Sequence, residues 1–487
     1  MNKWLIGLII LLVFLTISAY FYAEKLSLPI PLYDSSRYYY YVDRIVNTGL
    51  YFYDDLSYGG RFNTAPLLQD LIIVVLYKLF NFGATVYDFV KYYAFIILVL
   101  CSLFLYSFLY NKIGLVPAVF SVFLFVFNIK INNSFETGVI KHFQLGLLLL
   151  IIGFYIVERV RSRKILFIYG LVLSLSYLES VTLFLILLNY MILLRKGNKK
   201  FLMFGFVIGY AYWFMLILLS GEGILTSKYI YDKISENYNF SLGAATNVMG
   251  YAYLLFIPLF LRLLNRKDYS ELFLIFVLGI LLFGRLKDLT LFITISVILI
   301  SFGVDYLYKL NKPLTFIILF MVGFVYLLNY LNSASDIAWV RPSQDLIDGY
   351  SWLRINTPTD SVVFECINQG SQLLAYGRRR NTGDNFFEYV GDKPLNSSID
   401  YIDFISSYNY TISKNILNEY NASYVFFHKY MSDPCYWFVN PVDKLLMPNF
   451  FNNRTRAPFV YHLYRNDVNF LEKVYENNET IIYEVIQ

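Results

Sequence analysis

Carboxylates and arginines are the residue types through which this chain could do chemistry. Its three histidines are widely separated, and the sequence has no zinc-type cysteine cluster, phosphate-cradling glycine loop or nucleophile elbow. The charged residues of interest stand in short polar segments between apolar runs, at Asp34, Asp54, Asp55, Glu136, Glu236 and Arg285. Carboxylate oxygens suit Mg²⁺ or Mn²⁺, and a guanidinium offers a fixed fork of donors to a phosphate. Such a set suits metal-assisted chemistry at a phosphate, for example transfer of a sugar from a lipid phosphate or pyrophosphate.

The elements that must position these residues are predicted membrane spans. Apolar residues make up 57% of the 487 residues and charged residues 15%, which is typical of a membrane protein rather than a soluble one. Apolar runs long enough to cross a hydrocarbon core of about 30 Å recur up to about residue 331. We expect a polytopic α-helical membrane domain of about eleven spans, and at most thirteen. The expected spans are 4–22, 92–110, 115–130, 139–157, 165–178, 180–194, 201–219, 248–264, 271–283, 289–308 and 313–331.

The distribution of basic residues predicts the orientation of these spans. Residues 1–331 carry 27 Lys and Arg against 17 Asp and Glu, whereas residues 332–487 carry 13 against 18. Thirteen of these 27 basic residues are concentrated in four short loops, which the positive-inside rule assigns to the cytoplasm. These loops are 158–164, 195–200, 262–267 and 309–312. Each basic cluster is short and lies at the end of a span, so we expect no nucleic-acid partner.

With a cytoplasmic amino terminus, eleven spans place all the charged residues of interest on the outer side. The first span is expected to be a retained anchor rather than a signal peptide, because its apolar run is too long and no small-x-small site follows it. The first external loop then covers residues 23–91. Within it, Pro66–Phe80 is expected to form an external or re-entrant helix, since it is short and flanked by polar residues.

Residues 332–487 are expected to form an extracytoplasmic α/β domain. A helical pattern closes at Trp352–Asn356, and Ser361–Phe364 and Tyr424–Phe427 have the composition of buried strands. Five Asn-x-Ser/Thr triplets fit an exterior domain, at Asn396, Asn409, Asn421, Asn453 and Asn478. Cys366 and Cys435 could form one disulfide there, but we expect two unpaired thiols.

The stretch around Asp34 resembles the first extracytoplasmic loop of the catalytic subunit of oligosaccharyltransferase, a membrane glycosyltransferase of the GT-C type. Asp34 matches a family aspartate that binds the metal and contacts the acceptor. The segment that contains Asp54, Asp55 and Arg61 follows Asp34 at about the sequence spacing expected from the family. The resemblance implies that these three residues support the site around Asp34. The high usage of Ile, Lys, Asn and Tyr is typical of archaeal and other AT-rich microbial sequences.

Three later loops also resemble the family. Asn133–Gly138 is similar to its second acidic loop, with Glu136 as the carboxylate and Gly138 in place of a second acidic residue. Lys233–Glu236 resembles a later signature that ends in glutamate, and Arg285 lies where a family arginine contacts the donor phosphates. The resemblance implies that Asp34, Glu136 and Glu236 hold Mn²⁺ or Mg²⁺. It also implies that Asp34 and Glu236 position the acceptor.

The most specific family motif, Trp-Trp-Asp-Tyr-Gly, is missing. It recognises the hydroxyl of the acceptor's Ser or Thr, and the corresponding stretch here is Cys366–Gly370, with Asn368, Gln369 and Gly370 in the expected acceptor pocket. The downstream stretch Tyr376–Asn385 is similar to the family's Gly-x-Arg-x-x-x-x-x-Asp-Asn. A pocket built to pair a hydroxyl loses its discrimination when its partners are removed. The donor half of the site therefore resembles the family, and the acceptor half differs from it.

Three functions remain open from the sequence. The first is oligosaccharyltransferase-like transfer of a sugar or oligosaccharide from a lipid-linked donor to a protein or other acceptor on the outer face of the plasma membrane. The second is a polyprenyl-phosphate-sugar glycosyltransferase with Asp34 as general base on an acceptor hydroxyl. The third is a non-catalytic subunit that binds lipid-linked glycans. A transporter is poorly supported, because the spans hold few ionisable residues apart from Glu179.

Overall fold

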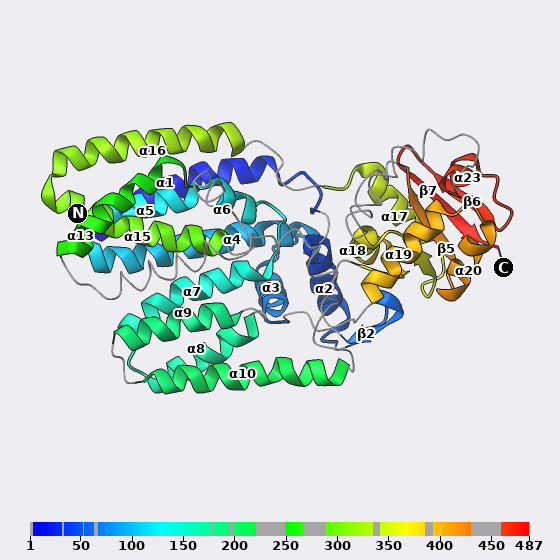
Figure 1. Ribbon diagram of the computed structural model, residues 1–487, viewed down its shortest axis with the longest axis horizontal. Helices are drawn as coiled ribbons and strands as arrows, with labels where there is room; N and C mark the ends of the chain where they lie inside the picture. The colour runs from blue at the N-terminus through cyan, green and yellow to red at the C-terminus, as the bar shows by residue number, and fades with distance from the viewer. Residues whose placement is uncertain are drawn as a thin grey trace. The chain divides into compact units, whose positions relative to one another are not determined.

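The fold was described from a computed structural model of the chain. The residues that the structure describes are 3–31, 34–51, 53–62, 67–176, 180–194, 198–220, 249–265, 289–334, 341–384, 393–429 and 459–486. They form two compact units, which are described separately (Figure 1). The first unit takes its described residues from 1–28, 66–214 and 235–339. The second unit takes its described residues from 29–65, 215–234 and 340–487, so the last residues of α10 (Lys199–Ser220) belong to it.

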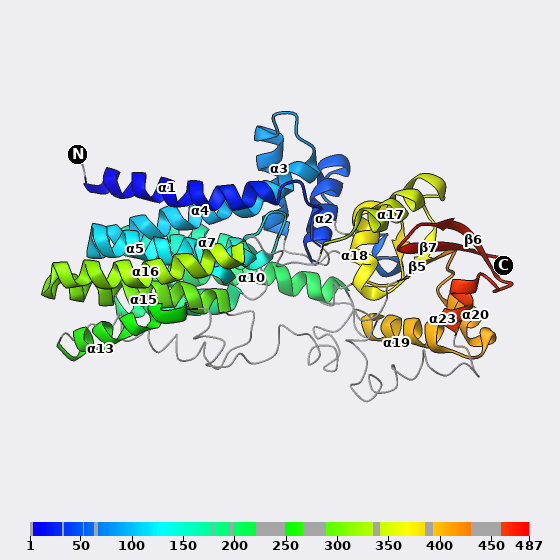
Figure 2. The same ribbon diagram turned by 90° about the horizontal axis from the view of Figure 1, so that it is seen from above.

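The first unit is helical. Its N-terminal half contains α1 (Lys3–Glu24), α3 (Leu67–Phe80), α4 (Val86–Ile113), α5 (Leu115–Val126), α6 (Ile129–Ser134) and α7 (His142–Arg159). It continues with α8 (Arg163–Ser176), α9 (Ser180–Leu193), α10 (Lys199–Ser220), η3 (Gly250–Leu255), α13 (Phe256–Asn265), α15 (Leu289–Leu310) and α16 (Lys312–Ala334). Helices α1, α4, α15 and α16 all contact α5, and the five run alongside one another (Figure 2).

Ten of the predicted spans coincide with helices, and the eleventh, 271–283, lies outside the described residues. Among the described helices, α1, α4, α15 and residues Lys312–Asn332 of α16 are long and apolar enough to cross a membrane. These apolar helices support a membrane location. The number of crossings and their direction stay predictions. A helix also forms at the predicted external segment, as α3.

Small residues let helices of this unit approach closely. A Cβ at Gly205 of α10 would lie 2.0 Å from the backbone oxygen of Phe167 in α8. A Cβ at Gly170 of α8 would in turn lie 2.3 Å from the backbone oxygen of Leu202 in α10. The two glycines therefore form a backbone-to-backbone crossing of the kind that is common between helices in membranes.

The C-terminal part of the second unit is an α/β fold, as predicted. Its sheet has the order β4-β3-β5-β7-β6, in which β4, β3 and β5 are parallel and β7 and β6 are antiparallel. The strands are β3 (Val362–Phe364), β4 (Arg380–Asn381), β5 (Tyr424–His428), β6 (Leu471–Glu476) and β7 (Thr480–Val485). Strands β3 and β5 form at the two predicted strand segments.

Alternating residues of β5 explain how helices cover both faces of this sheet. Tyr424 and Phe426 pack with residues of α17 (Gln344–Asn356), whereas Val425 and Phe427 pack with the opposite cluster. That cluster is supplied by α19 (Lys393–Ser406), α20 (Tyr410–Glu419) and α23 (Phe459–Arg465). The period of two in a strand thus gives a sheet that is buried on both faces.

The second unit also contains residues of the predicted first external loop. Helix α2 (Asp34–Thr48) is followed by the short strands β1 (Tyr53–Asp54) and β2 (Arg61–Phe62), with the turn η1 (Ser57–Gly59) between them. Helix α2 contacts α18 (Gly370–Gln372) and the π-helical turn η6 (Leu373–Gly377). Tyr40 and Tyr41 of α2 form a buried cluster with Leu374 and Ala375. The predicted division into a membrane domain (1–331) and an extracytoplasmic domain (332–487) stays a prediction.

Candidate active site

Glu136 lies in a tight turn at the end of α6. The amide of Val139 donates to the carbonyl of Glu136 at 2.9 Å, so residues 136–139 close a four-residue turn. Gly138, the third residue of the turn, has φ +77°, which a residue with a side chain rarely adopts. The turn therefore explains why the family's second acidic position is glycine in this chain.

The Glu136 turn is fastened to neighbouring helices. Thr137 donates its hydroxyl to the carbonyl of Tyr22 in α1 at 2.9 Å, and the amide of Gly138 donates to the carbonyl of Lys91 in α4 at 3.3 Å. Lys91 in turn donates from its Nζ to the carbonyl of Leu26, just after α1, at 2.7 Å. The end of α1 and the Glu136 turn are thus held in one arrangement.

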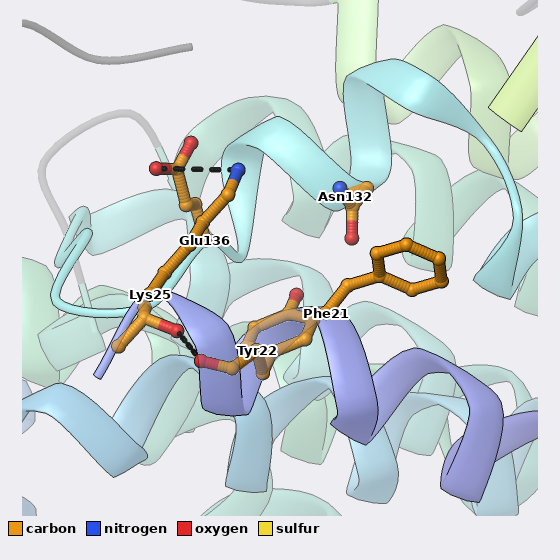
Figure 3. A pocket seen from close by; sticks show the side chains of 6 residues that line it. Phe21, Tyr22, Lys25, Asn132 and Glu136 are labelled. Carbon is orange, nitrogen blue, oxygen red and sulfur yellow. Dashed lines mark hydrogen bonds and ion pairs between the residues drawn. The ribbon is translucent and has the colours of Figure 1, made fainter. Parts of the chain in front are cut away.

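Lys25, which follows α1, is the cationic partner of Glu136. Its Nζ lies 3.6 Å from Oε1 of Glu136, and the two side chains are 8% and 1% exposed. Figure 3 shows the ammonium pointing toward the carboxylate, with Phe21, Tyr22 and Asn132 nearby. These residues and Thr137 line a small, partly open hollow. Sequence reasoning missed Lys25, although a lysine at the end of an apolar span could have drawn attention to it.

Asp54 and Asp55, both predicted as supporting residues, lie in the second unit and share the partner Arg44. Asp54 is fully buried and accepts hydrogen bonds from Tyr40 at 2.8 Å, Arg44 at 2.7 Å and the amide of Leu56 at 3.1 Å. Burial raises the pKa of Asp54, while Arg61 and Arg44 act to lower it. Asp55 is half exposed and pairs with Arg44 at 2.6 Å.

Arg61, the third predicted supporting residue, joins the first loop to the C-terminal fold through Asp384. Its NH2 lies 3.6 Å from Oδ1 of Asp384, and both side chains are buried. Ser57 donates its hydroxyl to Oδ2 of Asp384 at 2.6 Å, and Tyr58 also donates its hydroxyl to the carbonyl of Asp384. Asp384 belongs to the downstream stretch that resembles the family. We call Arg61, Asp384, Ser57 and their partner Asn381 the loop cluster.

The backbone adds to the loop cluster. The amide of Tyr58 donates to Oδ1 of Asn381 at 2.8 Å, and the amide of Asn381 donates to the carbonyl of Leu56 at 2.9 Å. A second ion pair joins Arg378 to Asp43 of α2. The structure thus brings the predicted first-loop residues together with the C-terminal domain.

The predicted acceptor pocket forms a buried turn after β3. Ile367–Gln369 forms a 3-10 turn, and Gly370 follows in α18. A Cβ at Gly370 would lie 1.9 Å from the carbonyl oxygen of Gly383, so only glycine fits there. The side chain of Asn368 lies outside the described residues. Cys366 is disulfide-bonded, so the expectation of two unpaired thiols is wrong at this position.

Glu365 is a buried carboxyl that sequence reasoning missed. It follows β3 directly, is fully buried and neighbours Tyr350 and Asp384. Burial, with the charge of Asp384, raises the pKa of Glu365 well above the ordinary value of 4.5, although a hydrogen bond with Tyr350 acts to lower it. A glutamate directly after a buried strand is the signal that could have identified it.

The remaining predicted site residues lie partly or wholly outside the described residues. Asp34 begins α2, but its side chain is not described, and Glu236 and Arg285 fall outside the described ranges. Their convergence with Glu136 stays a prediction. Within the described part of the chain, no group of three His, Cys, Asp or Glu side chains is placed to hold a metal. Of the three predicted ligands, only the side chain of Glu136 is described, and its pairing with Lys25 does not fit a metal ligand.

The fold is that of GT-C glycosyltransferases. The chain is similar to the archaeal oligosaccharyltransferase AglB from Archaeoglobus fulgidus, solved with an inhibitory peptide and dolichol-phosphate, at 14% identity and a TM-score of 0.64. That match covers 86% of this chain and 69% of AglB. It is also similar to ArnT from Cupriavidus metallidurans bound to undecaprenyl phosphate, at 11% identity and a TM-score of 0.57, over 97% of both chains.

A third similar structure is the arabinofuranosyltransferase AftD from Mycobacteria. It has 12% identity and a TM-score of 0.64, and the match covers 98% of this chain and 40% of AftD. No protein-family model and no curated protein sequence matches the chain. At these identities the likeness is one of fold, and it confirms the resemblance to the GT-C type at that level.

Proposed function

We propose that this chain is a membrane glycosyltransferase that transfers a sugar or oligosaccharide from a polyprenyl or dolichyl phosphate or pyrophosphate. Its reaction would be oligosaccharyltransferase-like N-glycosylation of a protein acceptor on the outer face of the plasma membrane. The observation that carries this proposal is the fold shared with AglB over 86% of the chain. A lipid phosphate is present in the AglB structure and in the ArnT structure, which supports a lipid-linked donor.

The proposed roles follow the predicted residues Asp34, Glu236 and Arg285, while Glu136, also predicted as a metal ligand, pairs with Lys25. Asp34 and Glu236 would hold Mg²⁺ or Mn²⁺ and position the acceptor, and Arg285 would bind the donor phosphate. A divalent cation at such a site neutralises negative charge that develops on the leaving phosphate. The loop cluster would keep the first loop on the C-terminal domain, so that the segment following Asp34 is fixed.

The proposed orientation places the amino terminus in the cytoplasm and the C-terminal domain outside. The basic loops support it, and so does the disulfide bond at Cys366, because disulfides persist in oxidising environments. Four of the five Asn-x-Ser/Thr asparagines lie in described residues, and all four are exposed. They are Asn396, Asn409, Asn421 and Asn478.

A second candidate function is transfer of a sugar from a polyprenyl phosphate to a hydroxyl or lipid acceptor. The match to ArnT favours it, because that match covers 97% of both chains. The missing Trp-Trp-Asp-Tyr-Gly motif favours it as well, since that motif recognises the peptide acceptor in the resembling family. Asp34 would then be the general base.

The test is transfer of labelled glycan from native lipid extract to an Asn-x-Thr peptide by the purified full-length protein. We expect glycopeptide to form with the wild type and to vanish in Asp34→Ala and Glu236→Ala. Asp360→Ala and Glu419→Ala are matched controls, because these carboxylates are exposed and lie outside the proposed site. Both should retain transfer.

Three outcomes separate the candidates. Glycopeptide that is lost in both variants supports the oligosaccharyltransferase-like function. Label that moves to a lipid or other hydroxyl acceptor, and not to the peptide, supports the second candidate. Donor binding without transfer to any acceptor would contradict both and would favour a non-catalytic glycan-binding subunit.

A further inference from the structure

The ammonium group of Lys25 lies next to the carboxylate of Glu136. Nζ of Lys25 and Oε1 of Glu136 are 3.6 Å apart, and water has little access to either side chain. An ion pair that is removed from water needs its partner, because one charge left alone there is strongly unfavourable. Lys25 therefore compensates the charge of Glu136 within the protein.

The backbone fixes this pairing. Lys25 lies in the turn after α1, where its amide donates to the carbonyl of Tyr22 at 3.2 Å. The same carbonyl of Tyr22 accepts the hydroxyl of Thr137, which is next to Glu136. The two charged residues thus project from two segments that are hydrogen-bonded to one carbonyl group. The ammonium does not depend on a mobile loop to reach the carboxylate.

The composition of the hollow also disfavours a metal at Glu136. Among the described residues that line it, Glu136 is the single carboxylate, and the others are Phe21, Tyr22, Lys25, Asn132 and Thr137. The position that would carry a second carboxylate is Gly138, whose positive φ suits glycine. A divalent cation needs several oxygen ligands and would be repelled by the ammonium.

We propose that Lys25 supplies the positive charge that Glu136 would otherwise take from a divalent cation, so that Glu136 is not a metal ligand in this protein. Lys25 is then a positioning residue, which holds the carboxylate of Glu136 directed to one side of the hollow. The proposal deepens the proposed function and rests on it only in assigning Glu136 to the active site. A pair without net charge next to the site does not repel an anionic donor phosphate.

The experiment is a titration of purified full-length protein with Mn²⁺ alone, in which free Mn²⁺ is followed by electron paramagnetic resonance. Wild type and Glu136→Gln are expected to bind Mn²⁺ with the same affinity. Lys25→Gln is expected to bind Mn²⁺ about tenfold more tightly or to gain a site, because removing an ammonium close to a carboxylate favours another cation there. The double variant Lys25→Gln with Glu136→Gln should return to the wild-type affinity.

Lys91→Gln is the matched control. Lys91 is also buried and contacts the end of α1, but through the carbonyl of Leu26 rather than through Glu136. This variant should leave Mn²⁺ affinity unchanged, and Lys25→Arg should resemble the wild type since it keeps the charge.

Two results would overturn the proposal. The first is weaker Mn²⁺ binding by Glu136→Gln in the wild-type background, which identifies Glu136 as a ligand and can be measured even if Lys25→Gln does not fold. The second is unchanged affinity in a folded Lys25→Gln. Because the titration contains no glycosyl donor, its result is independent of the transfer assay.

Discussion

The loop cluster of the second unit and the Lys25–Glu136 pair of the first unit neutralise buried charge in different ways. Both place charged groups out of contact with water. In the loop cluster, Asp384 accepts the hydroxyl of Ser57 at 2.6 Å and pairs with Arg61 at 3.6 Å. Nearby backbone hydrogen bonds tie the same segments together. In the Lys25–Glu136 pair, Nζ lies 3.6 Å from Oε1 beside a hollow, and the two side chains are 8% and 1% exposed.

The difference lies in the surroundings of the charges, since the loop cluster is enclosed between two segments of the second unit and the pair lines a hollow of the first unit. A buried network in which each member has several partners resists change, since every substitution leaves other groups unpaired. Two opposite charges that face each other beside a hollow can be removed together, which removes their desolvation penalty as well. We therefore expect substitutions in the loop cluster to affect stability most, and substitutions of the pair to be rescued by each other.

The largest effect is expected for Asp384→Ala. The change leaves Arg61 buried without its carboxylate and removes the acceptor of Ser57, so the free energy of unfolding should fall by about 3–5 kcal/mol. Hydrogen exchange at the amides of Tyr58 and Asn381, both hydrogen-bonded between loop and domain, should accelerate together. Asp360→Ala serves as the exposed control, and equal melting temperatures of the two variants would contradict the prediction.

A double-mutant cycle at Lys25 and Glu136 should give the next largest effect. Glu136→Gln alone leaves the ammonium without its counter-charge, and we expect it to cost about 1–3 kcal/mol. Lys25→Met with Glu136→Gln should recover to within about 1 kcal/mol of the wild type, because removing both charges removes the desolvation penalty as well. Thermal melting of the four proteins measures the coupling. Additive losses would show that the two residues act independently.

Glu365→Gln tests a buried carboxyl whose pKa is raised well above its ordinary value. The folded state keeps this proton at pH values where the unfolded chain has lost it. The stability contributed by the group is thus complete below the ordinary pKa of glutamate and falls as the pH rises above it. Glutamine should remove this loss and stabilise the second unit by about 1 kcal/mol at neutral pH. Hydrogen exchange in α17 and β5 at acid and neutral pH measures it, and a pH dependence that persists in the variant would refute it.

The smallest effect is expected for Asp55→Asn. Asp55 is half exposed and its pair with Arg44 is screened by water, so the free energy of unfolding should change by about 0.5 kcal/mol or less. Its buried neighbour Asp54, which accepts three hydrogen bonds, is the comparison, and Asp54→Asn should be clearly more harmful. Similar melting curves for Asp55→Asn and Asp54→Asn would contradict the prediction that the buried carboxylate contributes more to stability than the exposed one.

Local patterns in the sequence predicted much of the fold. Long apolar runs predict helices because length and composition decide whether a segment can cross a membrane, and ten of these helices form. Alternating or continuous apolar residues likewise predicted β3 and β5. Each of these predictions depends on residues that are close together in the chain.

Contacts between distant segments could not be predicted in this way. Ser57 and Asp384 are separated by 327 positions, and nothing in either segment specifies the other. The disulfide bond at Cys366 was missed for the same reason, since cysteine spacing alone does not fix a pairing. The pairing of Lys25 with Glu136 depends on how α1, α4 and the Glu136 turn meet.

The turn at Gly138 limits what substitution could achieve at this site. A carboxylate introduced at position 138 would have to adopt φ +77°, so the turn would deform before the new side chain reached the hollow. A second acidic residue at this position would therefore cost the turn conformational free energy. The backbone conformation at Gly138 thus favours a loop in which Glu136 is the acidic residue.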